Sequence, residues 1–478
     1  NATLPIDIVN TLVQGGSGAA AAPTITTTNL DSNGTLKFTG TGDLNAKGTG
    51  AFKLDGGTLD ADDSFKIGAV ITHTDSSTID VASGKTLTLN DNTSNQNIDI
   101  GAFTLTLKGG GEVSVDADVR INNASSIIEM ETADTFLNCE VKTSADVTSS
   151  GSGRIGTANV FGLLLKDNIR IATLTVTKKL AIDITSGKTA RIDSIVIGDG
   201  SAANTASVLK FVSGGNGGRL NDKTTDRGTL NLKKGSLDVD VDTSIGAVVS
   251  VNGDSIIEVA SGKTLTLDDN TSNQNIDVGA NTLTIKGTGE VDVAADVRIN
   301  NASSIIEIDG ADTFLNCEVT TSADVTSSGA GRVGTANVFG LLLTNDVRIA
   351  TLTVTKSLAI DITTGKTARI DAIVIGDGSA ANTASVLKFV SGGNGGRLND
   401  KTTNRGTLNL KKGSLDVDVD TSIGAVVSHT GDSIIDVASG KTLTFDDDTS
   451  NQNIDVGANT LNIKGTGKVS VAADVRIN

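Results

Sequence analysis

Apolar and polar residues alternate in short runs along most of the chain. The clearest run is Leu237–Asp242, in which Leu and two Val alternate with three Asp residues. A period of two places apolar side chains on one face of a β-strand and polar side chains on the other. Runs of this kind predict strands at Ile171–Thr177, Lys179–Ile184, Ala190–Ile197, Gly228–Leu232, Leu237–Val241, Ser255–Val259, Thr264–Leu267 and Asn281–Ile285.

Turn-forming residues separate these runs. They include Ser-Gly, Asn-Asn, Gly-Asp-Gly and the glycine-rich segment 214–218, all of which favour turns between strands. Only Leu163–Leu165 and Ala202–Lys210 are weak candidates for helix. The pattern therefore predicts an all-β protein.

A long internal repeat restricts the architecture further. Residues 118–295 and 296–473 are identical at 156 of 178 aligned positions. A repeat of constant length is typical of stacked arrays, so we expect a parallel β-solenoid (β-helix) built from a 178-residue repeat of about six to nine coils. A string of immunoglobulin-like sandwiches is the alternative, but the chain has no Trp, no Tyr and only 2 Pro, which disfavours it.

The repeat also predicts how the chain is divided. Residues 1–35 contain a Gly- and Ala-rich stretch ending at Pro23 and are expected to form an arm or linker. Residues 36–117 are a diverged partial repeat, 118–295 and 296–473 are full units, and 474–478 begin a further unit.

Charge and composition exclude several classes of protein. The formal net charge is −17 and the pI about 4.6, whereas nucleic-acid binding needs a cationic surface. No run of 18 apolar residues predicts a membrane span. The chain starts with Asn and not Met, which is what removal of a signal peptide would leave. We expect an extracellular or cell-surface protein.

The rarest side chains recur at equivalent positions. Cys139 and Cys317 lie one repeat apart, roughly 30–40 Å along a stack with ~4.8 Å per coil, too far for a disulfide. Two separate buried thiols are expected. His73 and His429 are also equivalent, and Val251 occupies that position in the intervening unit; this favours a surface role over catalysis or metal binding.

Two motifs resemble nucleotide-binding loops. Ser/Thr-Gly-Lys-Thr occurs at Ser83–Thr86, Ser186–Thr189, Ser261–Thr264, Thr364–Thr367 and Ser439–Thr442. A phosphate-binding loop needs a further glycine five residues before the Gly-Lys, and Ile stands there each time. Ile195–Ala203 resembles a dinucleotide fingerprint but no helical pattern follows it. Both motifs are better interpreted as turns between coils with the lysines in solvent, and we expect no cofactor.

Cation and sugar sites are weaker expectations. Gly214–Asp222 resembles a calcium nonapeptide but has Arg219 in place of the Asp. Asp238, Asp240 and Asp242 are candidates for loose Ca²⁺ binding, although alternate residues on a strand lie ~7 Å apart, and a solvated face is the simpler interpretation. Candidate N-glycosylation sites are Asn1, Asn33, Asn92, Asn123, Asn270 and Asn301.

Segments 48–59 (GTGAFKLDGGTL) and 281–291 (NTLTIKGTGEV) resemble the repeats of autotransporter passengers and filamentous haemagglutinin-like adhesins. The composition is also similar to prokaryotic sheath and surface-filament subunits. These resemblances imply a right-handed parallel β-helix on a cell surface.

The C-terminal residues suggest how such a protein would be used. Lys468–Asn478 closely matches the internal segment Glu290–Asn300, so Asp474, Val475, Arg476, Ile477 and Asn478 are expected to form an uncapped edge that pairs with another copy. We expect a non-enzymatic structural subunit of a filament, sheath or surface lattice. An adhesin stalk with cell-surface glycans as partners is the alternative, and a carbohydrate-active β-helix enzyme is a third interpretation.

Overall fold

The computed structural model places the chain in two compact units, Asn1–Val248 and Val249–Asn478. It describes residues 6–8, 11–14, 27–31, 34–39, 42–44, 50–89, 98–143, 162–201, 207–212, 219–220, 228–268, 276–301, 303–310, 313–321, 340–379, 385–390, 397–398, 406–446, 454–472 and 474–477.

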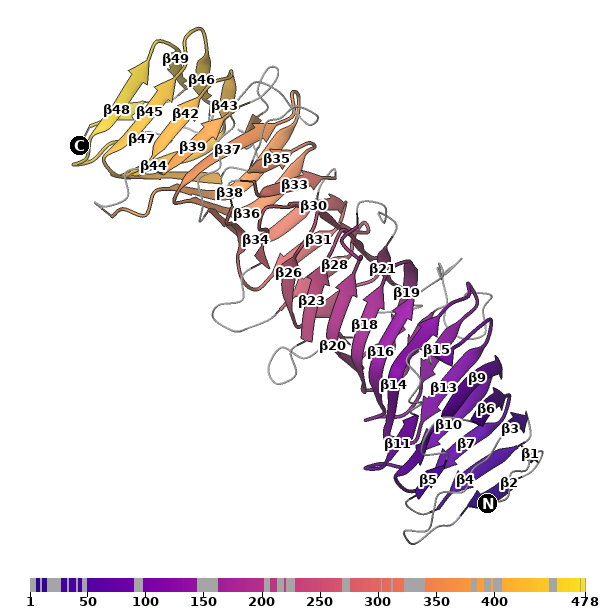
Figure 1. The fold of residues 1–478 in the computed structure, drawn as a ribbon. Helices are drawn as coiled ribbons and strands as arrows, with labels where there is room; N and C mark the ends of the chain where they lie inside the picture. Colours follow the sequence, from indigo (N-terminus) through magenta and orange to yellow (C-terminus); the bar gives the residue numbers. More distant parts are fainter. Residues whose placement is uncertain are drawn as a thin grey trace. The chain divides into compact units, whose positions relative to one another are not determined.

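Each unit is a stack of coils joined by parallel strand pairs (Figure 1). A strand pairs with the strand one coil further along the chain, so the partners of Thr58, Ser77 and Ile128 are Thr78, Leu105 and Leu163. The distance in sequence between partners varies from 19 residues, between Leu163 and Ile182, to 35 residues, between Ile128 and Leu163. Parallel pairing of every coil with the next is the arrangement of a β-solenoid.

One wall of the stack is a continuous parallel sheet, called sheet I. In the first unit it contains β2 (Thr11–Gln14), β4 (Thr35–Phe38), β7 (Thr58–Ala61), β10 (Ser77–Val81), β13 (Thr104–Lys108), β15 (Ile127–Met130), β17 (Leu163–Leu165), β19 (Lys179–Ile184), β21 (Val208–Phe211) and β24 (Ser236–Val239). In the second unit it contains β27 (Ser255–Val259), β30 (Thr282–Gly287), β33 (Ile305–Asp309), β35 (Leu341–Leu343), β37 (Ser357–Ile362), β39 (Val386–Phe389), β42 (Ser414–Val417), β45 (Ser433–Val437) and β48 (Leu461–Gly465).

The other walls belong to a second set of parallel strands, called sheet II. In the first unit these are β5 (Gly42–Leu44), β8 (Phe65–Ile67), β11 (Thr86–Leu89), β12 (Ile98–Asp99), β14 (Glu112–Ile121), β16 (Phe136–Thr143), β18 (Ile169–Val176), β20 (Thr189–Ile197), β22 (Arg219–Leu220), β23 (Gly228–Leu232) and β25 (Thr243–Ile245), followed by β26 (Ala247–Val251) at the unit boundary. A four-stranded sheet of β1 (Ile6–Ile8), β3 (Thr27–Asp31), β6 (Gly50–Asp55) and β9 (Ala69–Asp75) completes the first unit.

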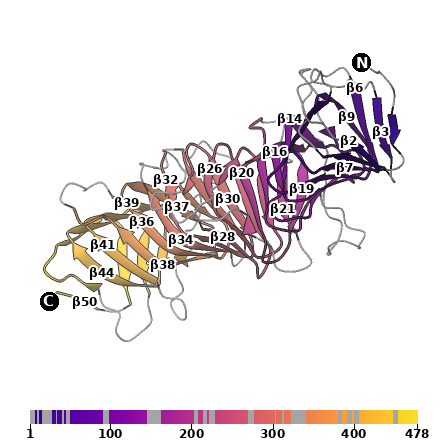
Figure 2. The same cartoon turned by 90° about the horizontal axis from the view of Figure 1, so that it is seen from below.

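In the second unit, sheet II contains β28 (Thr264–Leu267), β29 (Ile276–Asp277), β31 (Glu290–Val293), β32 (Val297–Ile299), β34 (Phe314–Thr321), β36 (Val347–Val354), β38 (Thr367–Ile375), β40 (Arg397–Leu398), β41 (Gly406–Lys411), β43 (Thr421–Ile423), β44 (Ala425–Gly431), β46 (Thr442–Phe445), β47 (Ile454–Asp455), β49 (Lys468–Val471) and β50 (Val475–Arg476). The view from below shows β41 and β44 side by side (Figure 2), paired from Gly406 and Ala425 onward.

The core is a set of aliphatic ladders inside each stack. In the second unit, Leu283, Ile306, Leu341 and Ile360 pair in succession on β30, β33, β35 and β37, and none is more than 1% exposed. Each of these strands places two or three such side chains inward, because strand residues of one parity face the interior. The narrow core explains how the chain folds with so few aromatic residues.

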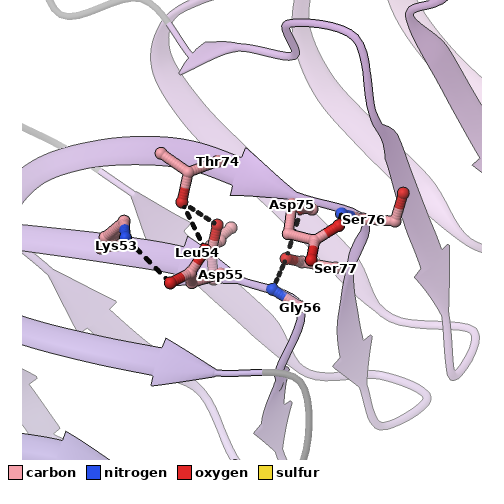
Figure 3. Close-up of polar contacts among 8 residues, drawn as sticks. All are labelled: Lys53, Leu54, Asp55, Gly56, Thr74, Asp75, Ser76 and Ser77. Carbon is pink, nitrogen blue, oxygen red and sulfur yellow. Dashed lines mark hydrogen bonds and ion pairs between the residues drawn. The ribbon is translucent and has the colours of Figure 1, made fainter.

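Buried hydroxyl groups satisfy the backbone where a coil turns from one wall to the next. Ser77, at the start of β10, donates to Asp75 O over 2.9 Å and accepts from Gly56 N of the preceding coil over 2.9 Å (Figure 3). In the second unit, Ser433 likewise donates to Gly431 O and accepts from Lys412 N. A backbone group left unpaired in such a corner would cost ~1–3 kcal/mol.

The structure confirms the all-β class and most of the predicted strands. Observed strands occupy Lys179–Ile184, Gly228–Leu232, Ser255–Val259 and Thr264–Leu267, as expected. The helical candidates were wrong where the structure describes them, since Leu163–Leu165 and Val208–Phe211 are strands β17 and β21. In the described part of the chain no helix is long and apolar enough to cross a membrane.

The N-terminal segment differs from the expected arm. Strand β1 pairs with β3, β2 with β4, and β3 with β6, all in parallel. The described residues of 1–35 therefore take part in the stack. Residues 15–26 lie outside the described residues.

Candidate functional site

The last coil of the chain leaves core positions exposed. It consists of β48, β49 and β50, which pair with β45, β46 and β47 of the preceding coil. In this chain no further described coil covers their other side. A closely similar sequence occurs inside the second unit in β30, β31 and β32, where β33 and β34 pair with it.

Comparison with this internal copy shows how far a following coil reduces the exposed fraction of each side chain. Ile285 is 1% exposed and its counterpart Ile463 is 53% exposed. Val297 is 1% exposed and Val475 50%, while Ile299 is fully buried and Ile477 is 86% exposed. Burying an aliphatic side chain of this size contributes about 1.5–3 kcal/mol. Together with the unpaired backbone groups of an edge strand, this surface is suited to bind another coil. Of the expected edge residues, Asp474 and Arg476 are also exposed, and Asn478 lies outside the described residues.

The Ser/Thr-Gly-Lys-Thr motifs are turns between sheet I and sheet II. Gly84, Gly187, Gly262, Gly365 and Gly440 all adopt positive φ, between 66° and 76°. The turn interpretation of these motifs agrees with this geometry. The placement of the lysines in solvent was only partly right, because Lys188 Nζ lies 2.6 Å from Asp167 Oδ1 of the preceding coil. That contact lowers the pKa of the Asp167 carboxyl.

The residue that follows the lysine connects the same two coils. Thr189 N donates to Asn168 Oδ1 over 2.8 Å, and in the second unit Thr367 N donates to Asp346 Oδ1 over 2.7 Å. A side-chain acceptor thus continues the hydrogen-bond ladder at a corner where no backbone carbonyl is in position. The motif therefore joins neighbouring coils. The glycines of the Ile195–Ala203 motif, Gly198 and Gly200, also adopt positive φ.

The candidate Ca²⁺ ligands take part in ion pairs and hydrogen bonds along the strands. Asp240 Oδ2 lies 2.8 Å from Lys210 Nζ on the neighbouring strand, and Asp238 accepts from Ser236 Oγ. Asp242 is exposed beyond the end of β24. Among the described residues, no group of three or more His, Cys, Asp or Glu side chains is arranged to hold a metal ion. The nonapeptide-like segment 214–222 lies outside the described residues except for Arg219 and Leu220.

The two histidines are buried, so the expected surface role was wrong. His73 and His429 are 7% and 6% exposed. His429 Nδ1 lies 3.3 Å from Val456 O, whereas among the described residues no hydrogen-bond partner is found for either ring nitrogen of His73. Burial lowers the pKa of His73 to about 4, and the negative charge of Asp75 opposes this shift more weakly. The residue occupies a core position that Val251 fills in the intervening unit.

Cys139 and Cys317 are free and buried, as expected. Burial raises the pKa of both thiols to about 12. Such thiols pack as small apolar side chains and are poor nucleophiles.

Two of the candidate glycosylation sites lie on exposed turns. Asn123 and Asn301 accept through Oδ1 from Ser125 N and Ser303 N, over 3.0 and 2.9 Å, and both are exposed. Asn1, Asn33, Asn92 and Asn270 lie outside the described residues.

A cluster that the sequence did not predict lies on the outer surface of sheet II. The guanidinium carbon of Arg170 lies 4.2 Å from the ring centroid of Phe136, one coil earlier. Asp193 accepts from Arg170 Nη2 over 2.7 Å and from Arg191 Nε over 3.0 Å. Arg170 and Arg191 face each other in register, and the shared carboxylate neutralises this like-charge pair.

The second unit contains the same cluster at Phe314, Arg348, Arg369 and Asp371, with a cation–ring distance of 4.1 Å. Phe136 and Arg170 are separated by 34 residues, more than most coils, so their contact could not be read from spacing alone. The alternation in Phe136–Val141, which turns Phe136 outward, was the available signal.

Comparisons with protein-family models, with curated proteins and with solved structures give no match. The all-β structure with long parallel sheets is consistent with a β-solenoid, and no comparison names an adhesin or an autotransporter.

Proposed function

We propose that this chain is a structural subunit of an extracellular filament, sheath or surface lattice, whose copies join end to end through solenoid edges. In this proposal the 178-residue repeat is the building module. In the second unit, seven strand pairings separate β30 from β48, and their equivalent residues Leu283 and Leu461 are 178 positions apart.

The exposure of the last coil carries the proposal. Ile463, Val475 and Ile477 are half to almost fully exposed, whereas the same residues in the internal copy are covered by the next coil. A first coil from a second copy would cover these side chains and pair with the strand edge in the manner already used inside the stack. Heterologous contacts of this head-to-tail kind produce open fibres when the rotation between copies does not close a ring.

The regular ion pairs between coils also support a structural role. On the outer surface of sheet I, Lys108 pairs with Asp80, Lys286 with Glu258 and Lys388 with Asp418, each one coil apart. Exposed pairs contribute little individually, but they keep neighbouring strands in register on a surface that would otherwise carry unpaired like charges.

The test is a pair of variants in the second unit. Ile463→Asp combined with Ile477→Asp places charges on the coil surface, while Val426→Asp changes an exposed apolar residue, 36% accessible, on β44 of an earlier coil. Electron microscopy and sedimentation velocity should show polymers for the native chain and for Val426→Asp, and single subunits for the double variant. Polymers that persist in the double variant would overturn the proposal.

A covalent continuation of the chain would cover the same surface and is the competing outcome. The mass of the native subunit distinguishes the two. A subunit that continues with further coils after Asn478 would contradict a joint at this coil.

A further inference from the structure

The charges of this chain are sorted into blocks. Residues 151–235 and 329–413 are basic, with 13 and 11 Lys or Arg against 6 and 5 Asp or Glu. The flanking blocks are acidic, and they contain 5 Lys or Arg against 15 Asp or Glu (57–150), 3 against 16 (236–328) and 4 against 10 (414–478). The net charge of −17 therefore combines acidic blocks of −10, −13 and −6, basic blocks of +7 and +6, and −1 from residues 1–56.

The fold converts these sequence blocks into bands along each stack. Because each coil pairs with the next, consecutive stretches of sequence become consecutive layers. In the second unit, the strands β30 to β34 are followed by β35 to β41 and then by β42 to β49 (Figure 1). The described residues of 282–321 carry 2 Lys or Arg against 6 Asp or Glu, those of 340–413 carry 8 against 4, and those of 414–477 carry 4 against 8. In the first unit, an acidic band ending at β16 precedes a basic band that begins at β17.

Each band presents its charge on more than one wall. In the basic band of the second unit, Lys388 lies on sheet I, Arg348 and Arg369 on sheet II, and Lys356 at an exposed turn between them. In the acidic band that follows, Asp418 lies just beyond β42 and pairs with Lys388 across the band boundary, and Asp436 on β45 pairs with Lys464. Asp420 and Asp432 of this band are exposed at turns. A neighbouring molecule would meet the same sequence of bands from several sides.

The spacing of the bands determines at which salt concentration a neighbouring molecule interacts with each band separately. Seven coils at ~4.8 Å give a period of ~34 Å, so an acidic and a basic band are ~17 Å apart. The Debye length is about 10 Å at 0.1 M salt and about 30 Å at 0.01 M. At moderate salt each band acts separately, whereas at very low salt neighbouring bands merge into the overall negative charge.

We propose that two copies of this chain associate side by side with a stagger of about half a period, ~17 Å, so that basic bands of one face acidic bands of the other. This contact is lateral and independent of the end-to-end joint. It gives a filament or sheath subunit a self-complementary outer surface without an apolar patch.

The salt dependence is the first test. Association measured by light scattering and sedimentation should be weak at about 0.01 M salt, strongest near 0.1 M and weak again near 1 M. Repulsion by net charge alone would give association that rises steadily with salt, and simple ion pairing would give a steady fall. Either steady trend would overturn the proposal.

Two variants with equal net charge form the second test. Lys178→Gln with Lys356→Gln removes two exposed charges from basic bands, and Ala102→Glu with Ala280→Glu adds two exposed charges to acidic bands. Each double variant has a formal charge of −19 in place of −17. Near 0.1 M salt, the lysine variant should raise the lateral dissociation constant about tenfold, while the alanine variant should leave it unchanged or lower it. Equal weakening by both would overturn the proposal.

Further arms separate this contact from its alternatives. The Ile463→Asp, Ile477→Asp variant should retain lateral association, which distinguishes failure of the lateral contact from failure of the end-to-end joint. Association that disappears with a chelator would indicate divalent cations bridging acidic bands. Association that requires an added acidic polysaccharide would indicate that the basic bands bind a polyanion. Both results would replace the proposed contact.

Discussion

The imidazole of His73 lies against the ring of Phe103, with centroids 5.9 Å apart and planes inclined by 55°. His73 is on β9 and Phe103 is at the turn before β13, one coil later. The histidine thus belongs to the core and is held there in its neutral form, since burial lowers its pKa to about 4.

This pKa predicts a loss of stability in acid. The unfolded chain takes up a proton at His73 below about pH 6.5, and the folded chain does so only near pH 4. Stability is therefore complete above pH 6.5 and falls as the pH drops toward 4, by about 3 kcal/mol in total. His73→Val should remove this part of the pH dependence, measured as amide hydrogen exchange of Ala69–Asp75 at pH 7.5 and 4.5.

The reciprocal change is the control for His73. Val251→His places an imidazole at the equivalent core position of β26, and exchange there should become faster in acid. If exchange in β9 is equally acid-sensitive with and without His73, the assignment of the effect to this residue is wrong.

The buried thiols lead to a prediction about reactivity. Because burial raises the pKa of Cys139 and Cys317 to about 12, their thiolate fraction near pH 8 is roughly a thousandfold below that of an exposed cysteine. Iodoacetamide should label neither residue in the folded chain and both after unfolding in denaturant. Mass spectrometry measures the extent of labelling. Rapid labelling of the folded chain would contradict the burial of these side chains.

Alternation predicted the strands and the core but not the contacts between coils. Ile71 and His73 share one parity on β9 and both face inward, so the alternation alone would have placed His73 in the core. The surface role was inferred instead from Val251 at the equivalent position, and that inference was wrong. Valine at an equivalent position argues for an apolar environment as strongly as against catalysis. The register between coils was harder to predict from the sequence, because the spacing of paired residues varies from 19 to 35 residues.

Tight approach of neighbouring coils makes certain glycines irreplaceable. A Cβ on Gly287, with φ of 94°, would lie 2.1 Å from Val259 O of the previous coil. Gly262 also has a positive φ, 66°, but a Cβ there would meet nothing within 4 Å. Gly287→Ala should therefore destabilise the second unit by about 3 kcal/mol or more and Gly262→Ala by about 1 kcal/mol. Denaturation midpoints of the two variants measure the difference, and equal losses would exclude a steric cause.

The corner acceptors provide the last prediction, for which the chain contains its own control. Asn168 Oδ1 accepts from Thr189 N, and the second unit has Asp346 at the same position, accepting from Thr367 N. Asn168→Ala leaves the Thr189 amide without this acceptor and should cost about 1 kcal/mol, because water replaces part of the lost bond at an exposed corner. Asn168→Asp should be neutral, since the carboxylate accepts equally well. Amide exchange at Thr189 is the direct measurement, and it should accelerate in the alanine variant alone. Acceleration in both variants would mean that Nδ2 of Asn168, and not its acceptor Oδ1, stabilises this turn.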